Sequence, residues 1–334
     1  MPHKSIDHIG LYWASRSVIL MNLLVAGGCS TSLFQWVDYS AADEFMRQGY
    51  AYLDQGLTDS ALASFGLALE ADPKLLEAHM SMGSVFRHHG NYELAGRCYE
   101  RAVSLDPNDF DARYSLGWMQ HLQGKLKEAV SNYLHAILID PDSFDANLNL
   151  AGAYLQLGQP TDALPYAQRA TELRSGSQAA WSNLATIFSL LGQYEEAVGA
   201  YHEAIELGEM AEPILLGLAN AHLRLHRYEQ AVVALQSLVT THPSTLVHQR
   251  IGYAYFKMRQ FPKALDHFRA ALEIDNHDPL ALNGAGVCLM AMYLENGRDN
   301  PSHRDEALNA WRQSLKLREE QPHIADLLSR YERL

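Results

Sequence analysis

The chain has 334 residues, of which 48% are hydrophobic, and 26 Lys and Arg against 39 Asp and Glu give a formal net charge of −13. This hydrophobic share excludes a globally disordered chain, and the acidic excess argues against nucleic-acid binding, which usually requires a basic surface. Three cysteines are too few for a disulfide scaffold. The totals therefore indicate an acidic globular protein and identify no activity.

The N-terminal segment differs from the rest of the chain. Residues 17–28 form a run of twelve without a charge, and Lys4 and Arg16 precede it. Twelve helical residues span only ~18 Å, less than the ~30 Å hydrocarbon core of a bilayer. The run is therefore typical of the apolar core of a signal peptide rather than of a membrane span.

The end of this segment resembles the lipobox of bacterial lipoproteins, because small residues at 26–28 directly precede Cys29. The resemblance implies a lipoprotein-type signal peptide at 1–28, lipidation of Cys29, and a tether at 29–41. Two or three acyl chains would hold a folded domain stably on a membrane.

Two features of this segment leave alternatives open. Ala26 stands where leucine is commonest in a lipobox, so an ordinary secretory signal cleaved near Gly28, or an apolar N-terminal helix, remains an alternative. Ser30, rather than aspartate, follows the cysteine. In a diderm bacterium this implies a lipid-anchored protein of the outer membrane, and the alternative location is secreted or periplasmic.

From residue 42 onward the sequence repeats with a period of 34 residues. The prolines of three Asp-Pro pairs are spaced by this number, and glycine, alanine and aromatic ladders keep the same register. These ladders are Pro73, Pro107 and Pro141; Gly56, Gly90, Gly124, Gly158 and Gly192; Ala61, Ala95, Ala129, Ala163, Ala197 and Ala231; and Phe65, Tyr99, Tyr133 and Tyr201. Several ladders in one register identify internal repeats.

Each unit reads as two antiparallel amphipathic helices. In the second unit, Val85 and Phe86 belong to the apolar stripe of the first helix, and Gly90 follows where the chain must reverse. Tyr99 belongs to the apolar stripe of the second helix, which ends before Pro107 because proline has no N–H to donate.

The unit resembles the tetratricopeptide repeat (TPR), which implies an all-α, right-handed superhelical solenoid of about eight helix-turn-helix repeats. Units start near residues 42, 76, 110, 144, 178, 212, 245 and 279 and fill 42–320. The last unit carries an insert at about 295–303, and 321–334 is predicted to be a capping helix.

The sequence offers no catalytic constellation. The metalloprotease, serine-hydrolase and phosphate-loop motifs are missing, and Cys98 and Cys288 fall in distant units. Adjacent helical side chains such as those of His88 and His89 point about 100° apart, so they cannot share a metal ion. We therefore expect a protein that is not an enzyme and has no cofactor and no metal site.

The informative polar residues lie on the face of each first helix that turns away from the second helix, which in a solenoid lines the concave groove. The predicted partner-binding residues are Glu77, Arg87, His88, Asp111, Tyr114, Trp118, His121, Asp145, Asn149, Asn183 and Thr186. The same face continues through Asn220, Arg224, Tyr253 and Lys257. An ordinary solvated helix face is the alternative, and for Trp118 the alternative is packing against the next first helix.

Asn149 and Asn183 are one repeat apart and resemble two rungs of the asparagine ladder in the repeat domain of O-GlcNAc transferase. That resemblance implies amides that grip a peptide backbone, since an amide both donates and accepts.

Two functional hypotheses follow from the sequence. The first is a non-catalytic, membrane-anchored scaffold that binds a protein or peptide in the groove, similar to the TPR lipoproteins of pilus assembly, secretion or cell-envelope complexes. The alternative is the repeat arm of a glycosyltransferase related to O-GlcNAc transferase, lacking the catalytic domain here, because the repeats leave no residues for a nucleotide-sugar domain. The partner, the pathway and the oligomeric state stay open.

Overall fold

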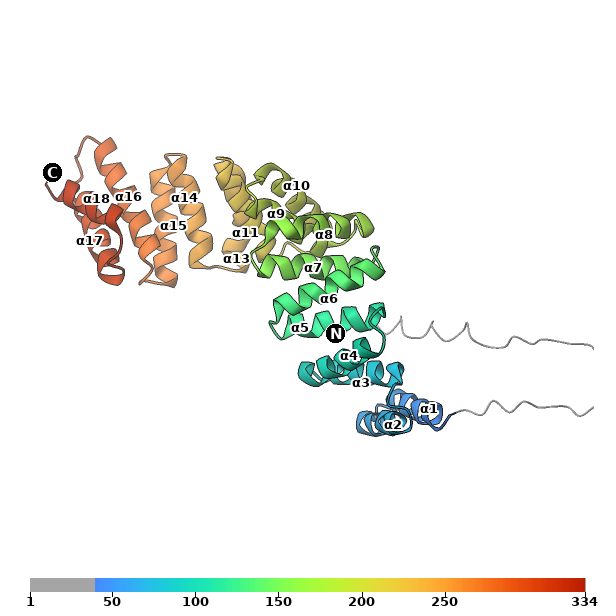
Figure 1. Ribbon diagram of the computed structural model, residues 1–334. Helices are drawn as coiled ribbons and strands as arrows, with labels where there is room; N and C mark the ends of the chain where they lie inside the picture. The colour runs from blue at the N-terminus through green and yellow to red at the C-terminus, as the bar shows by residue number, and fades with distance from the viewer. Residues whose placement is uncertain (1–39, 334) are drawn as a thin grey trace, which may run out of the picture. The chain divides into compact units, whose positions relative to one another are not determined.

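The computed structural model describes residues 40–333, and every element of regular secondary structure in this range is an α-helix (Figure 1). The predicted signal peptide, Cys29 and all but the last two residues of the predicted tether lie outside the described residues. None of the described helices combines the length and apolarity that a bilayer crossing requires.

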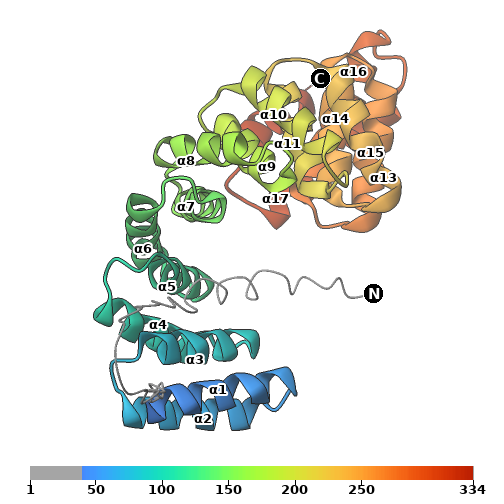
Figure 2. The ribbon, with the colours of Figure 1, turned by 90° about the vertical axis from the view of Figure 1, so that its right-hand side faces the viewer.

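The described helices form eight antiparallel pairs and a final single helix (Figures 1 and 2). The first helices of the pairs are α1 (Ala41–Asp54), α3 (Leu76–His88), α5 (Phe110–Leu122), α7 (Phe144–Gln156), α9 (Gln178–Leu190), α11 (Glu212–Arg224), α14 (Thr245–Lys257) and α16 (Pro279–Glu295). The second helices are α2 (Thr58–Ala71), α4 (Tyr92–Leu105), α6 (Leu126–Ile139), α8 (Pro160–Leu173), α10 (Tyr194–Glu206), α12 (Tyr228–Gln236) with the short α13 (Leu238–Thr241), α15 (Phe261–Ile274) and α17 (Pro301–Leu317). The helix α18 (Pro322–Glu332) follows. Each pair packs against the next, so the predicted all-α repeat solenoid is confirmed.

The turn inside each pair depends on one left-handed residue. Gly90 has a φ of 72° and Gly124 a φ of 74°, a conformation that glycine adopts without steric cost. In the sixth and seventh pairs the same turn is kept by His226 and Arg259, each with a φ of 59°. The left-handed turn is therefore kept in two pairs that have no glycine at this position.

The turn between pairs is built by the Asp-Pro step. The Asp106 carboxylate accepts a hydrogen bond of 2.9 Å from the Asn108 N–H, while the Asp106 N–H caps the helix by donating to the Ala102 carbonyl. Pro107 cannot continue the helix. In the next first helix, the Asp109 side chain accepts from the Ala112 N–H at 2.7 Å and starts α5.

The two helices of a pair approach closely where a small residue faces a ring. A Cβ atom at Gly117 would lie 3.0 Å from the Tyr133 ring, and one at Gly49 would overlap the Phe65 ring. Tyr133 and Phe65 are fully buried. The aromatic ring fills the space that the missing side chain leaves, and this contact recurs with Trp311 over Gly286 in the last pair.

Most of the extra residues of the eighth unit extend its two helices, and only a short loop separates these helices. The helices α16 and α17 each have 17 residues, whereas the other first helices have 13 or 14. Only residues 296–300 separate them. The two longest helices of the described chain therefore form its last pair.

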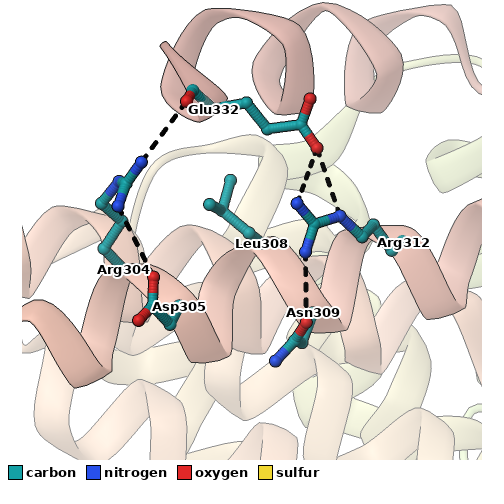
Figure 3. Close-up of a pocket in the computed structure, with 6 residues that line it drawn as sticks. All are labelled: Arg304, Asp305, Leu308, Asn309, Arg312 and Glu332. Carbon is teal, nitrogen blue, oxygen red and sulfur yellow. Dashed lines mark hydrogen bonds and ion pairs between the residues drawn. The ribbon is translucent and has the colours of Figure 1, made fainter. Parts of the chain in front are cut away.

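The final helix covers the apolar end of this pair. Ile324 is buried, and Leu327, Leu328 and Tyr331 pack against the same core cluster. Figure 3 shows how α17 holds α18: Arg312 donates two hydrogen bonds to the Glu332 carboxylate at 2.8 and 3.2 Å, and Arg304 donates to the Glu332 carbonyl. Arg304 also donates to the Tyr331 carbonyl. Both arginines are thus occupied by the chain itself.

Truncation of the ring in one pair should damage mainly that pair and its neighbours. We expect Tyr133→Ala to lower the free energy of unfolding by about 3–5 kcal/mol, because it leaves a cavity against Gly117. Repeat arrays are stabilised by nearest-neighbour contacts. Hydrogen exchange should therefore accelerate in α5 to α7 and stay slow in α15 to α17; a uniform rise along the chain would contradict the repeat model.

A pair of histidines lies between the helices of the seventh pair. The Nδ1 atoms of His248 and His267 are 3.2 Å apart, so one donates to the other when both rings are neutral. Burial lowers the pKa of both rings from 6.5, and the neighbouring His248 further lowers the pKa of His267. The folded state therefore binds fewer protons here than the unfolded chain.

Stability should fall as the pH drops below about 6.5, because the unfolded chain takes up protons that the folded pair excludes. We expect the melting temperature at pH 5.5 to be lower than at pH 7.5. His267→Gln should reduce this difference, whereas the exposed His135→Gln should leave it unchanged. An equal pH dependence in His267→Gln and the wild type would show that the pair does not contribute.

Candidate functional site

The predicted binding residues occupy the first helices α3, α5, α7 and α9 at positions that repeat from pair to pair. Eight of them are half-buried, namely Glu77, Arg87, Tyr114, Trp118, His121, Asn149, Asn183 and Thr186. Three are exposed, namely His88, Asp111 and Asp145. We call the surface formed by these positions the inner face.

Trp118 is covered on one side by the preceding pair. The Arg87 guanidinium lies 4.7 Å from the centroid of the Trp118 ring, a cation–π contact between α3 and α5. The Tyr114 ring lies 6.2 Å from Trp118 on the same helix. The tryptophan is therefore half-buried between neighbouring side chains rather than freely exposed, and Arg87 fixes its orientation.

A hydrogen bond joins the next two first helices. The Asn149 amide donates to the Tyr114 hydroxyl at 2.8 Å. Burial raises the pKa of Tyr114 to about 12, and the Asp145 carboxylate adds to this rise, so the phenol stays protonated at neutral pH. With its N–H donated to Tyr114, Asn149 retains its carbonyl oxygen as an acceptor.

Gly152 contributes no side chain in the middle of the inner face, and we call the room that a methyl group would fill there the gap at Gly152. A Cβ atom built there would lie 4.0 Å from both the Asn183 amide nitrogen and the His121 ring, so these two side chains flank it from α9 and α5. Burial lowers the pKa of His121, against a hydrogen bond with Gln156 that raises it. His121 is therefore a neutral ring at neutral pH.

Other predicted residues are held by their own surroundings. The Tyr50 hydroxyl donates to the Glu77 carboxylate at 3.0 Å and lies 2.7 Å from the Ser81 hydroxyl, which joins α1 to α3. The Thr186 hydroxyl donates to the Ser182 carbonyl of its own helix, so its oxygen alone remains for a partner.

Together these contacts connect the first helices in order, α1 to α3, α3 to α5, and α5 to α7. The inner face is thus a row of side chains whose positions are fixed by neighbours across the helices. Such a row can bind an extended chain through hydrogen bonds and aromatic contacts, and it contains no nucleophile activated by a base.

The described residues contain no cluster of three or more His, Cys, Asp or Glu side chains that could hold a metal ion. Burial raises the pKa of Cys98 to about 11 and that of Cys288 to about 12, so neither thiol is a reactive thiolate at neutral pH.

A pocket lies farther along the inner face, beyond the predicted set of binding residues; Asn220, Arg224 and Tyr253, through which the sequence predicts that the face continues, line it. It measures about 440 Å³ and draws residues from α9, α10, α11 and α14, including Ser189, Tyr201, Arg224 and Arg250. A signal for it existed in the sequence: continuing the register of Asn149 and Asn183 by 34 and then 33 residues leads to Gly217 and Arg250, which both line this pocket.

Every protein-family model that matches the chain here is a model of the tetratricopeptide repeat. Tetratricopeptide repeat models match residues 38–75, 142–216, 214–245 and 246–278, and a TPR repeat model matches residues 83–124 and 119–158. A comparison with curated proteins found no match.

Solved structures show the same fold. A structure titled as a functional characterisation of Pseudomonas aeruginosa pilF aligns over 64% of this chain and 97% of that one, with 23% identity and a TM-score of 0.52. A tetratricopeptide repeat protein from Parabacteroides merdae aligns over 75% and 99%, with 18% identity and a TM-score of 0.50. At these identities the likeness concerns the fold alone. The repeat-family models, which between them match more than half of the residues, and the eight helix pairs show that this chain belongs to the tetratricopeptide repeat family.

Proposed function

We propose that this protein is a non-catalytic scaffold that binds an extended segment of a partner protein along the inner face of α3, α5, α7 and α9. The observation that carries the proposal is the gap at Gly152, flanked by His121 and Asn183 in the middle of an otherwise continuous row of polar and aromatic side chains. A backbone without a side chain lets a bound chain come close to the helix.

The chemistry of the row suits a peptide backbone. Asn149 keeps a free amide oxygen next to the buried Tyr114, and no hydrogen bond holds the Asn183 amide within the described residues. Trp118 supplies an oriented aromatic surface, and aromatic side chains contribute much of the affinity at protein interfaces. Asp111 and Asp145 are exposed beside them and would set the register of a partner by charge.

We further propose that the scaffold is attached to the cell envelope through lipid on Cys29, in the outer membrane of a diderm bacterium. The lipobox-like residues before Cys29 support the lipid attachment, and Ser30 after it supports the outer membrane. The resemblance to TPR lipoproteins of pilus assembly, secretion and cell-envelope complexes makes such an assembly the proposed setting.

A large side chain at position 152 should block binding without disturbing the fold. In Gly152→Ala the new Cβ makes only ordinary contacts, so capture of partners from detergent-solubilised native membranes should equal that of the wild type. In Gly152→Trp the indole would occupy the gap, and we expect at least tenfold less of the specific partner in quantitative mass spectrometry of the eluate.

The matched control is Gly199→Trp, because Gly199 is exposed on the second helix α10 and has open space around it. This variant adds the same indole away from the inner face and should capture normally. If Gly152→Trp captures as much partner as Gly199→Trp, then binding does not use this surface and the proposal is wrong.

The anchor can be tested independently of the partner. Cys29→Ser removes the proposed lipid attachment site, and since residue 29 precedes the first helix pair in the sequence, the variant should keep the wild-type melting temperature. We expect it to move from the membrane fraction to the soluble fraction. Sedimentation of Cys29→Ser with membranes after a salt wash would rule out attachment through this cysteine.

A further inference from the structure

A second polar surface lies beyond the gap at Gly152, in the fifth to seventh helix pairs. It is the 440 Å³ pocket to which α9, α11 and α14 each contribute inner-face side chains and α10 contributes two tyrosines. Its charge is opposite to that of Glu77, Asp111 and Asp145 at the other end of the inner face. We call it the arginine pocket, after Arg224 and Arg250.

Within the part of the chain that the structure describes, no carboxylate neutralises either arginine of this pocket. Arg224 lies over the Tyr194 ring, 5.2 Å from its centroid, which holds the guanidinium in place. Among the described residues, neither Arg224 nor Arg250 forms an ion pair with a carboxylate. Arg250 is half-buried, so part of its hydration is lost without compensation from an anion.

The arginines of this pocket differ from two arginines in the last helix pair of the solenoid. There, Arg304 and Arg312 also face a hollow in the surface, but Glu332 and the carbonyls of α18 occupy their N–H groups (Figure 3). The arginine pocket has the same cationic groups, but among the described residues no carboxylate pairs with Arg224 or Arg250 in this way.

The inner wall of the pocket offers hydrogen-bonding groups besides the charges. Tyr201 comes from the second helix α10, yet a Cβ atom at Gly217 would overlap its hydroxyl, so the absence of a side chain at 217 lets this phenol reach the pocket. Ser189 and Asn220 also line the pocket. The Ser189 hydroxyl and the Asn220 carbonyl oxygen are buried from solvent and have no hydrogen-bond partner among the described residues, so a ligand would reach them only after a side-chain rotation.

The rim of the pocket is apolar. Leu190 is 60% exposed and Tyr253 is 42% exposed, and both border the pocket. The Lys257 ammonium lies 5.4 Å from the centroid of the Tyr253 ring and adds a third positive charge close by. A bare inorganic anion would use the arginines but would leave the rim uncovered and the Asn220 oxygen without a donor.

We propose that the arginine pocket binds an acidic side chain, Asp or Glu, of an extended protein segment. The carboxylate pairs with Arg224 and Arg250, as guanidinium groups pair with carboxylates elsewhere. A backbone N–H of the segment donates to Asn220 after a small rotation of its amide, and an apolar side chain beside the acidic residue covers Leu190 and Tyr253. The partner class rests on the proposed scaffold function, but the pocket is separate from the gap at Gly152.

The test uses the full-length chain in detergent and fluorescent, end-blocked hexapeptide pools with Glu followed by Leu at the two central positions. A second pool has Gln in place of Glu, and a third has phosphoserine. We expect the Glu pool to bind at least tenfold more tightly than the Gln pool by fluorescence polarisation. We also expect the difference to shrink as salt is raised from 50 to 500 mM.

Variants assign the binding to the pocket. Arg250→Gln and Tyr253→Ala should each weaken the Glu pool at least fivefold with unchanged melting temperatures. Arg101→Gln is the matched control, because it removes an exposed arginine from the second helix α4, and it should bind as the wild type does. Failure of the proposed groove would appear as equal partner capture by Gly152→Trp and Gly199→Trp, whereas failure of the arginine pocket would appear as unchanged binding of the Glu pool by Arg250→Gln, so the two failures give different results.

Three outcomes would overturn the proposal. One is equal binding of the Glu and Gln pools, and another is unchanged binding by Arg250→Gln. The third is preference for phosphate, seen either as tenfold tighter binding of the phosphoserine pool than of the Glu pool or as displacement of the Glu pool by inorganic phosphate at 1 mM. Either form of this third outcome would assign the pocket to a phosphorylated ligand.

Discussion

The close approach of two helices within each pair is the constraint on which the rest of the structure depends. In most pairs it combines a residue without a large side chain on the first helix with a ring on the second, as at Gly117 and Tyr133; the fourth and sixth pairs have Ala167 and Leu235 in place of the ring. Because the side chains of the second helix fill the space over the first, the pair behaves as a unit with two remaining apolar faces. Only stacking against further pairs buries these faces, so the array and its inner face follow from this contact.

The same contact explains where binding groups lie. The side of the first helix opposite the second helix is not needed for the core of its pair, so its residues are free to differ from unit to unit. Arg87, Tyr114, Trp118 and Asn149 use that freedom. Across neighbouring helices, Arg87 contacts Trp118 and Asn149 donates to Tyr114. A similar contact between neighbouring pairs shapes the pocket. Gly217 of α11 has no side chain, and this leaves room for the Tyr201 hydroxyl of α10 beside the pocket that both residues line.

The fold could be read from the sequence because its determinants are local and repeated. The glycine, alanine and proline ladders mark the turns, the close contacts and the helix ends, and each operates within one unit. The inner-face positions could be predicted for the same reason. Periodicity predicts which positions lie on this face, but it does not predict the contact of Arg87 with Trp118 or the hollow between α9, α11 and α14, because these depend on how neighbouring pairs stack. The sequence of the eighth unit is visibly irregular, yet its extra residues extend α16 and α17 in a way that no period predicts.

The left-handed turns of the sixth and seventh pairs have a consequence for how the array comes apart. His226 and Arg259 adopt a conformation that costs a residue with a side chain roughly 1–2 kcal/mol more than it costs glycine. This cost falls on two adjacent units in the second half of the array, which therefore contribute less intrinsic stability than the units with glycine in the turn. In a chain of coupled units, such a region acts as an internal boundary: thermal fraying can begin there as well as at the ends, and a partner that spans it would join two cooperative blocks into one.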